Sequence, residues 1–491
     1  MLMIASNRDF NENSSPYFRY SSIGNLFEQD TCSDCHAFKW AKETPGFCCY
    51  QGKIKLEKVH DPPAVIEHLL KNKEFTDNIR GYNNALALAS LGTDHKPEIG
   101  PNFKIQGKLH HKIGSLSPVD GNPKFAQLYF FDSEHELENR LQHVSSLKPE
   151  IIEQLQSCLH RVNPYIKDIK VALEVVKDAP ECRLILSNNV KLQPKEAHPR
   201  TYNLPTGSEV AVLLPGDQLG DLDVVLQTRC GNLQRINAVH RSYDALHYVL
   251  LLPTGQDGFK PGIPMQKGNE KVSIMQFYAF QLQVRKNSFN ILLRGHRLTQ
   301  QYITDQYAKV ERARLTWAHL NQKTIKAEKY RGLLDAYDNG DIAAAGKRFI
   351  LPPSITYSPR WYVERYQDGM TIVKHTGKSD IFVTFTCNPK WPEITKSLHP
   401  GEIAYDRPDI CARVFNIKSK QLVEYIVKNG IFGKTVAHVE TIEWQKRKGL
   451  PHLHLLVTLH PDFKIRDPSD INKFVSEEIS SNLPDLRHTY V

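Results

Sequence analysis

The stretch TVAHVETIEWQKRKGLPHLHLLVTLH, residues 435–460, predicts two β-strands joined by a basic loop. Successive side chains of a strand point to opposite faces. In the second strand, His452 and His454 therefore share one face. The other face is apolar throughout, with Leu453, Leu455, Val457 and Leu459. This alternation is typical of a half-buried strand, so we expect two imidazoles on the side that faces away from a core.

The strand before the loop offers further ligands on the same side of this hairpin. Glu443 and Gln445 share one of its faces. Pairing across a loop of residues 446–451 would place Gln445 opposite His452 and Glu443 opposite His454, and opposed side chains lie about 5 Å apart. Two ring nitrogens with a carboxylate or amide oxygen suit Mg²⁺ or Mn²⁺, and Zn²⁺ is an alternative.

A partly hydrated metal at this place could polarise a phosphodiester oxygen and stabilise the charge that develops during cleavage. The loop residues Lys446, Arg447 and Lys448 could hold the neighbouring phosphates. The competing interpretation is a surface strand with two incidental histidines, because a bare His-x-His is a common pattern.

The N-terminal region contains a second set of metal-ligating residues. Four cysteines form a Cys-x2-Cys pair and an adjacent pair: Cys32, Cys35, Cys48 and Cys49. This spacing fits a small Zn²⁺ site. Adjacent cysteines do not easily both reach one ion, so His36 or His60 is an alternative ligand. The competing interpretation is a set of reduced, partly buried thiols, and nine cysteines in a long chain argue against a disulfide framework.

The bulk composition favours an intracellular protein with a polyanionic partner. The 491 residues are enough for two to four domains. They contain no apolar run of about 18 residues, as a spanning helix needs, and the apolar start is too short for a signal peptide. The formal charge is +9, and residues 281–350 carry 13 Lys and Arg against 6 Asp and Glu. Such a balance favours nucleic acid as a partner, with a solvated helical face as the alternative.

Periodicity and breaks predict an α+β fold in four regions. These are a zinc-finger-like segment, a mixed α/β region, a basic helical segment and an α/β domain, at residues 1–60, 61–270, 271–350 and 351–491. In the last region, strands are expected at 381–386, 435–445 and 452–459, and helices near 361–376, 410–429 and 471–480. Upstream, the pattern predicts a strand over 103–113, another over 125–131 and one helix over 134–159.

Several motifs resemble those of one known family. EWQKR (443–447) followed by GLPHLH (449–454) is the first, and DIFVTFTCNPKWPEI (380–394) is the second. Shorter matches are NIRGYNNA (78–85), FAQLY (125–129), YQD (366–368) and DRPD (406–409). Together they resemble the Rep-type nuclease region of Helitron rolling-circle transposases, the Helitron helicase-like domain. This family belongs to the class of nucleases with a His-hydrophobe-His (HUH) motif. Lys448 is one residue more than the usual family spacing.

The resemblance implies a fold and a chemistry. The region 351–491 is expected to be an HUH-nuclease-like antiparallel sheet flanked by helices, and the N-terminal cysteines a zinc-finger-like cluster. The histidine pair would hold the metal that polarises the scissile phosphate, and a tyrosine would attack the phosphorus. The substrate would be single-stranded DNA at transposon ends, in the nucleus, with no membrane involved. Lys390, in the second motif, joins the basic loop as a candidate DNA-binding residue.

Other residues of the second motif receive structural interpretations. Thr384, Thr386 and Asn388 share one face of its strand, a pattern typical of a half-buried central strand. Trp391 could stack on a base, but packing is the preferred interpretation.

The family's catalytic tyrosines lie on a helix well beyond the histidines, and this sequence offers only Tyr490 there. Its context, LRHTY, does not match that helix, and no Gly-x4-Gly-Lys-Ser/Thr motif of a helicase is present. We therefore expect no catalytic nucleophile in these residues, as in a fragment or decayed copy that binds metal and DNA without completing cleavage. The alternatives are a catalytically dead DNA-binding module and a metal hydrolase that uses an activated water. The oligomeric state is not predicted.

Overall fold

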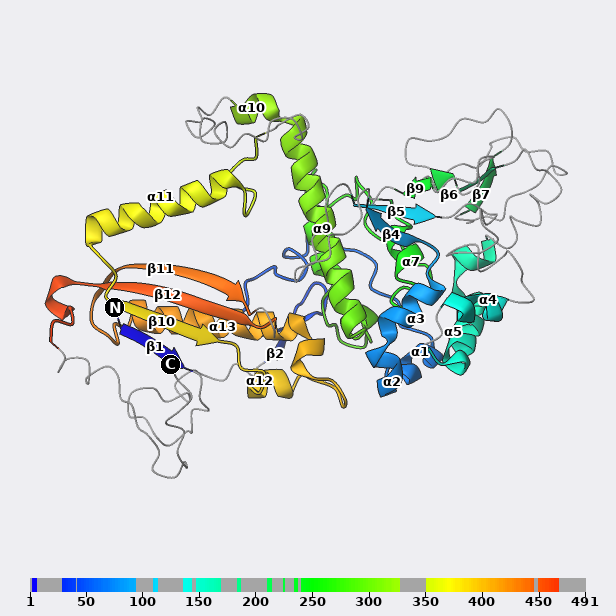
Figure 1. Ribbon diagram of the computed structural model, residues 1–491, viewed down its shortest axis with the longest axis horizontal. Helices are drawn as coiled ribbons and strands as arrows, with labels where there is room; N and C mark the ends of the chain where they lie inside the picture. Colours follow the sequence, from blue (N-terminus) through cyan, green and yellow to red (C-terminus); the bar gives the residue numbers. More distant parts are fainter. Residues whose placement is uncertain are drawn as a thin grey trace. The chain divides into compact units, whose positions relative to one another are not determined.

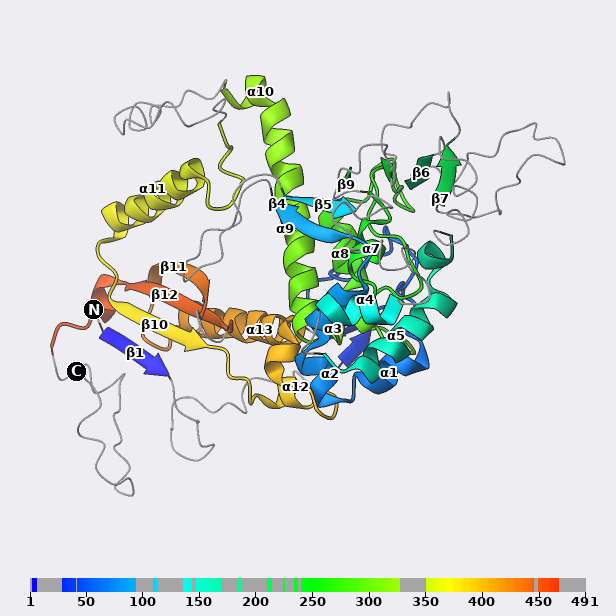
Figure 2. The same cartoon turned by 45° about the vertical axis from the view of Figure 1, so that its right-hand side comes forward.

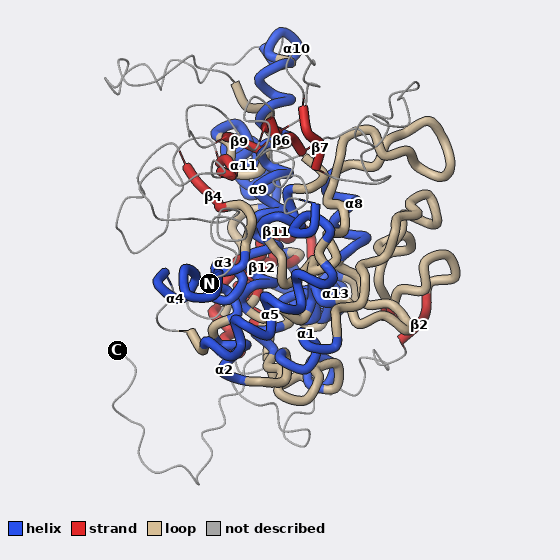
Figure 3. Tube along the Cα trace, turned by 90° about the vertical axis from the view of Figure 1, so that its right-hand side faces the viewer, coloured by secondary structure: helices blue, strands red, loops and turns tan. Residues whose placement is uncertain are grey.

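The computed structural model describes residues 2–6, 29–40, 42–93, 109–113, 136–143, 147–168, 183–186, 210–213, 224–225, 234–236, 240–326, 350–445 and 449–467. Contacts along the chain divide it into two compact units. Unit 1 comprises Met1–Phe27 and Arg314–Val491, and unit 2 comprises Glu28–Ala313. Helices and strands contribute to both units (Figures 1 and 3), so the expected mixture of helix and sheet is confirmed.

A four-stranded sheet forms the centre of unit 1 (Figure 1). Its strand order is β1 (Leu2–Ser6), β10 (Ile381–Thr386), β12 (Pro451–Leu459) and β11 (Thr435–Trp444). β10, β12 and β11 pair antiparallel, and β1 is added parallel to β10. The three antiparallel strands match the sequence-based expectation closely, whereas the pairing of β1 was not foreseen.

One face of this sheet is covered by α13 (Pro408–Val427), which runs along it in both Figure 1 and Figure 2. The side chains of Leu453, Leu455 and Val457 on that face are fully buried. Phe385 of β10 stacks on Phe415 of α13, with ring centroids 5.6 Å apart. The apolar side of the hairpin thus forms the core that its alternation predicts.

Prolines mark the starts of the helices around the sheet, because a proline at the first helical position removes no hydrogen bond. α11 (Pro359–Thr376), α12 (Pro392–Thr395) and α13 all begin in this way. Ser358 also caps α11 by accepting a hydrogen bond from the backbone N–H of Trp361 at 3.2 Å. The remaining short helices of unit 1 are α10 (Gln322–Lys326), η5 (Ala404–Asp406) and η6 (Pro461–Phe463).

A buried charged pair lies beside the sheet core. Lys418 of α13 donates from Nζ to Oε1 of Glu393 at 2.6 Å. Its ammonium also lies 5.0 Å from the ring centroid of Trp391, and that ring stacks on Phe385. Trp391 is therefore buried in packing contacts, as the preferred interpretation of the sequence has it.

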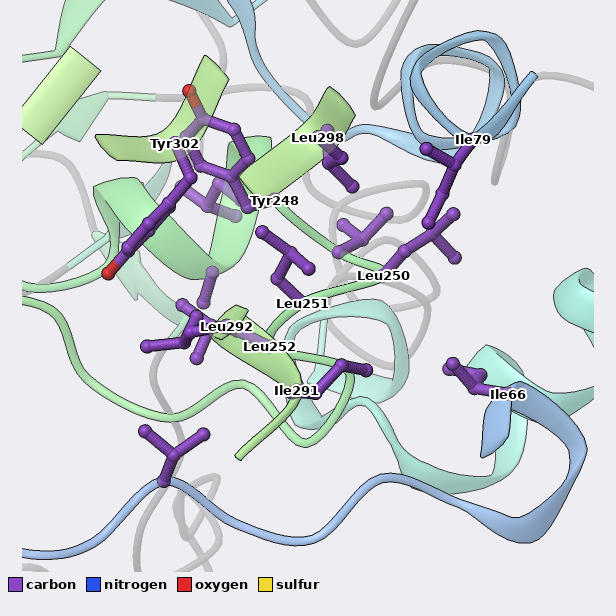
Figure 4. Close-up of a cluster of buried hydrophobic side chains, with 14 of the residues drawn as sticks. Ile66, Ile79, Tyr248, Leu250, Leu251, Leu252, Ile291, Leu292, Leu298 and Tyr302 are labelled. Carbon is purple, nitrogen blue, oxygen red and sulfur yellow. The ribbon is translucent and has the colours of Figure 1, made fainter. Parts of the chain in front are cut away.

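Unit 2 is built mainly from helices around an apolar core, part of which is shown in Figure 4. The described helices of this unit include α1 (Ala64–Leu69), α2 (Lys73–Asp77), α3 (Ile79–Leu86), α4 (Glu136–His143), α5 (Pro149–Val162), α7 (Tyr243–His247), α8 (Ile274–Gln281) and η3 (Ile291–Leu293). The boundary between the two units falls within α9 (Arg297–Leu320). Tyr248, Leu250, Leu251 and Tyr302 are fully buried at the centre of the cluster.

The prediction of a single helix over residues 134–159 is wrong, because the structure has two helices there, α4 and α5. Pro149 begins the second one, and the residue before it, Lys148, is extended with ψ 122°. A residue that precedes proline is disfavoured in the helical region by steric clash. The break is therefore a local effect of Pro149.

Among the described residues of unit 2, the short strands form three small sheets. β2 (Gln29–Thr31) pairs with β3 (Phe38–Trp40). β5 (Leu109–Ile113) lies between β4 (Ser90–Thr93) and β9 (Gln234–Ile236), and β6 (Arg183–Leu186) lies between β7 (Val210–Leu213) and β8 (Val224–Val225). The expected strand over 125–131 lies outside the described residues.

A polar network is also buried in unit 2. Lys309 lies 2.5 Å from Oδ1 of Asp244, and Tyr278 donates its hydroxyl to Oδ2 of the same carboxylate at 2.8 Å. Nearby, Tyr243 donates to Asp305 at 2.6 Å. Burial lowers the pKa of Lys309, and the carboxylates of Asp244 and Asp305 oppose that effect. Among the described helices of both units, none has the length and apolar character needed to cross a membrane.

Candidate metal centres

The two histidines lie on the central strand β12, between β10 and β11. His452 is opposite Glu443 of β11 and Thr386 of β10, and His454 is opposite Thr441 and Thr384. The expected register, with Gln445 opposite His452 and Glu443 opposite His454, is wrong by two residues. A shift of two residues keeps every side chain on its face, so Glu443 still shares the face of the histidines.

The hairpin turn explains this shift. The backbone N–H of Gln445 donates to the carbonyl of Leu450 at 3.0 Å, and that of Gly449 donates to the carbonyl of Gln445 at 2.8 Å. Gly449 has φ +61°, a conformation that favours glycine. Gln445 therefore closes the turn, and strand pairing ends at Trp444 and Pro451.

The side chains on the histidine face approach one another closely. The two imidazole centroids are 4.5 Å apart at an interplanar angle of 76°. Oε2 of Glu443 lies 3.5 Å from Nε2 of His454, diagonally across the two strands. Phe382 of β10 stacks on the ring of His454, at 5.4 Å and 9°. Oγ1 of Thr386 lies 2.6 Å from Nδ1 of His452.

Burial lowers the pKa of His452, the neighbouring His454 adds to that effect, and Glu443 opposes it. A lowered pKa keeps the imidazole neutral at neutral pH, which is the form that binds metal. The side chain of His454 is 27% exposed and that of Glu443 is 65% exposed, so an ion or a phosphate from solvent can reach this face.

The four N-terminal cysteines form a tighter group. All four are buried, and their sulfurs lie within 4.8 Å of one another. Among the described His, Cys, Asp and Glu side chains, no other group of three or more meets that spacing, so the histidine face is a pair with one nearby carboxylate. Sγ of Cys49 lies 3.7 Å from that of Cys32 and 3.9 Å from that of Cys48. Tetrahedral zinc with Zn–S bonds of about 2.3 Å separates its sulfurs by about 3.8 Å.

The turn after Cys49 lets two adjacent cysteines reach one point. Tyr50, Gln51 and Gly52 all have positive φ values, of 56°, 57° and 74°. In this turn, the backbone N–H of Gly52 donates a hydrogen bond to the sulfur of Cys49 at 3.3 Å. The alternative ligands are not in the group: His36 is exposed, and the ring of His60 contacts Thr254 and Glu57.

The thiols of this cluster differ in acidity. A hydrogen bond from Cys48, together with the charge of Arg285, lowers the pKa of Cys35 to about 5. Burial raises the pKa of Cys49 to about 11, and the hydrogen bond to Cys35 raises that of Cys48. Arg285 is held in place by an isolated β-bridge to Ala37 and by a 2.7 Å hydrogen bond to the carbonyl of Phe280. A cation fixed beside thiolates would offset the negative charge of a four-cysteine metal site.

Comparison with known families identifies the region that carries the histidines. Residues 277–457 match the family model described as the Helitron helicase-like domain at the N-terminus. This region is therefore related to the Helitron helicase-like domain. A search of curated proteins gave no match.

The Helitron match runs from α8 to β12. It includes the histidine face and suggests a Helitron-type transposase region. The cysteine cluster lies before the matched residues, although Arg285, whose charge acts on Cys35, lies within them.

The described residues include only some of the other candidate residues. Lys446, Arg447 and Lys448 lie outside the described residues, as do Tyr490 and the expected helix 471–480. Lys390 is exposed in the turn after β10, where its backbone N–H donates to Oδ1 of Asn388 at 2.9 Å. The sequence pattern assigned Thr386 only a half-buried position. Its contact with His452 could be foreseen only with the strand order and register, since β10 and β12 are far apart in sequence.

Proposed function

We propose that this Helitron-related chain contains an HUH-type DNA-processing site, which binds single-stranded DNA and a divalent metal for nicking in rolling-circle transposition. The observation that carries the proposal is the sheet face shared by His452 and His454 of the inner strand β12 and Glu443 of the edge strand β11, within residues that match a Helitron family model. No nucleophile is assigned among the described residues.

The spacing of His454 and Glu443 supports a shared divalent ion. Two ligands at right angles around a metal, each at about 2.1 Å, lie about 3 Å apart. Nε2 of His454 and Oε2 of Glu443, at 3.5 Å, need only a small closing movement to share one ion. His452 would supply the other ring nitrogen, in its neutral form. When bound, the ion would act as a Lewis acid on a phosphodiester oxygen.

The protein's own residues would orient the DNA. Lys390 is exposed four residues beyond Thr386, and Lys446, Arg447 and Lys448 belong to the loop that joins β11 and β12. Lysine and arginine side chains neutralise phosphates and thereby supply much of the affinity for DNA. A net charge of +9 agrees with such a partner. A site of this class would work in the nucleus, on transposon ends.

We also propose that Cys32, Cys35, Cys48 and Cys49 bind Zn²⁺ as a structural site. Sulfur separations of 3.7 and 3.9 Å, together with the burial of all four cysteines, support a closed tetrahedral site without an open position for substrate. Such an ion would stabilise the fold of unit 2 around β2 and β3.

Mn²⁺ titration of the full chain tests the histidine site, with His452→Ala and His454→Ala as variants. His438→Ala is the matched control, because His438 is exposed on the opposite face of the same hairpin. We expect both site variants to lose Mn²⁺ binding in calorimetry, while the control binds as the unchanged chain does. Unchanged Mn²⁺ affinity in both site variants would refute the metal assignment.

Incubation of the chain with single-stranded and duplex oligonucleotides tests the substrate. We expect tighter binding to the single strand and nicking that requires Mn²⁺. Binding without nicking would favour the alternative of a DNA-binding module that lacks catalysis. Nicking without a covalent protein–DNA adduct would favour a hydrolase that uses an activated water.

A further inference from the structure

Thr386 is the last residue of β10 and lies directly opposite His452. Its Oγ1 is 2.6 Å from Nδ1 of the imidazole. The strand around it is firmly held, because β10 pairs with β1 on one side and with β12 on the other. The next residue, Cys387, continues the ladder by donating its backbone N–H to the carbonyl of Pro451 at 3.0 Å. A β-branched side chain on such a strand has few rotamers, so the hydroxyl has few alternative positions.

A neutral imidazole carries one proton, and its two nitrogens therefore have different roles. With Nδ1 held by Thr386, Nε2 is the nitrogen that can accept a metal. A metal-binding nitrogen must be unprotonated, so the proton has to reside on Nδ1 and be donated to Oγ1. Groups that hold the second nitrogen of a metal-binding histidine fix both the tautomer and the ring orientation.

We infer that Thr386 is a positioning residue, which holds His452 in the Nδ1-protonated tautomer and presents Nε2 to a divalent ion. This inference rests on the proposed function of the histidine face. The other imidazole is oriented differently, since Phe382 of the same strand stacks on His454. β10 thus supports both histidines, one by a hydrogen bond and one by ring stacking.

The tautomer is measured by NMR on the metal-free full chain with ¹⁵N-labelled histidine, whose two ring nitrogens have distinct shifts when protonated. The signals that are absent from the spectrum of His452→Ala are those of His452. We expect a protonated Nδ1 in the unchanged chain, a mixture of tautomers in Thr386→Val, and restoration in Thr386→Ser. Thr441→Val is the matched control, because Thr441 is exposed on the same face, opposite His454.

Mn²⁺ affinity is measured on the same proteins. Loss of a group that orients a metal ligand typically weakens binding about 10- to 100-fold. We expect that loss in Thr386→Val, near-complete recovery in Thr386→Ser and no change in Thr441→Val. If Thr386→Val does not fold, Thr386→Ala replaces it with the same expected results.

The two readouts separate this inference from the proposed function. If the unchanged chain shows protonated Nε2, or if removal of the hydroxyl alters neither the tautomer nor the affinity, the role of Thr386 is refuted. A Thr386→Ser chain that behaves like Thr386→Val refutes it as well. If the unchanged chain has protonated Nδ1 but does not bind Mn²⁺ at the histidines, the proposed metal function fails while the contact itself stands.

Discussion

Replacing Lys418 by methionine should destabilise unit 1 strongly. The side chains of Lys418 and Glu393 are 1% and 4% exposed, and they are 2.6 Å apart. Lys418→Met keeps the length of the side chain but leaves the carboxylate buried without its cation. Removing one partner of a buried pair costs about 3–5 kcal/mol, because the remaining charge is uncompensated. For a unit of about 200 residues, each kcal/mol lowers the melting temperature by about 2–4 °C, so a loss of about 6–20 °C is expected.

The double variant Glu393→Met/Lys418→Met should recover most of this loss. Removing both charges eliminates the uncompensated group, and apolar replacement of a buried pair is often neutral or stabilising. A control exists next to the C-terminus of α13, where Lys428 and Glu424 are 2.8 Å apart but 71% and 56% exposed. Exposed pairs of this kind contribute about 0.3–0.5 kcal/mol, so the melting temperature of Lys428→Met should lie within about 2 °C of that of the unchanged chain.

Urea and thermal unfolding, followed by circular dichroism, measure these differences, and hydrogen exchange of the β10 and β12 amides assigns them to unit 1. A Lys418→Met chain within about 1 kcal/mol of the unchanged chain would refute the reasoning. A double variant as unstable as the single one would show that shape, and not charge, is the cause.

Three further predictions concern unit 2. Elemental analysis should detect one bound zinc in the unchanged chain and in Cys158→Ser, which lies outside the cluster, but none in Cys48→Ser. Equal zinc content in the two variants would contradict the four-cysteine site. Zn²⁺ binding at pH 7 should release at least two protons, because the raised pKa values of Cys48 and Cys49 keep both thiols protonated and the metal binds thiolates. Calorimetry in two buffers of different ionisation enthalpy counts the released protons, and release of none would contradict the assignment. Asp244→Asn should lower the free energy of unfolding by about 3–5 kcal/mol, because it leaves buried Lys309 without its anion. The control Asp368→Asn, in an exposed pair with Arg365, should lower it by less than about 1 kcal/mol. Urea unfolding measures both changes.

The sequence predicts those parts of unit 1 that depend on local alternation. The bounds of β10 follow from its run of β-branched and aromatic residues, and the two faces of β12 follow from period two. The register across the hairpin does not follow, because it depends on a turn in which Gln445 and Gly449 take part. A slip of two residues leaves the hydrophobic pattern unchanged, so the pattern cannot detect it.

Contacts between distant segments are the other limit. Thr386 reaches His452 only because β10 pairs with β12, and nothing in the local sequence of either strand specifies that neighbour. In the cysteine cluster, the Cys-x2-Cys spacing is visible in the sequence, but the simultaneous reach of Cys48 and Cys49 is not. It requires positive φ at Tyr50 and Gln51, which residues other than glycine seldom adopt.

The parallel pairing of β1 with β10 imposes an order on the synthesis of this protein. Leu2–Ser6 leave the ribosome before unit 2 does, and their partner strand follows about 375 residues later. At about 5–20 residues per second, this interval lasts about 20–75 s. The whole of unit 2, Glu28–Ala313, is made within that interval and can fold before β10 exists. The sheet that carries the histidines is therefore completed late, and its first strand must stay available for pairing until then.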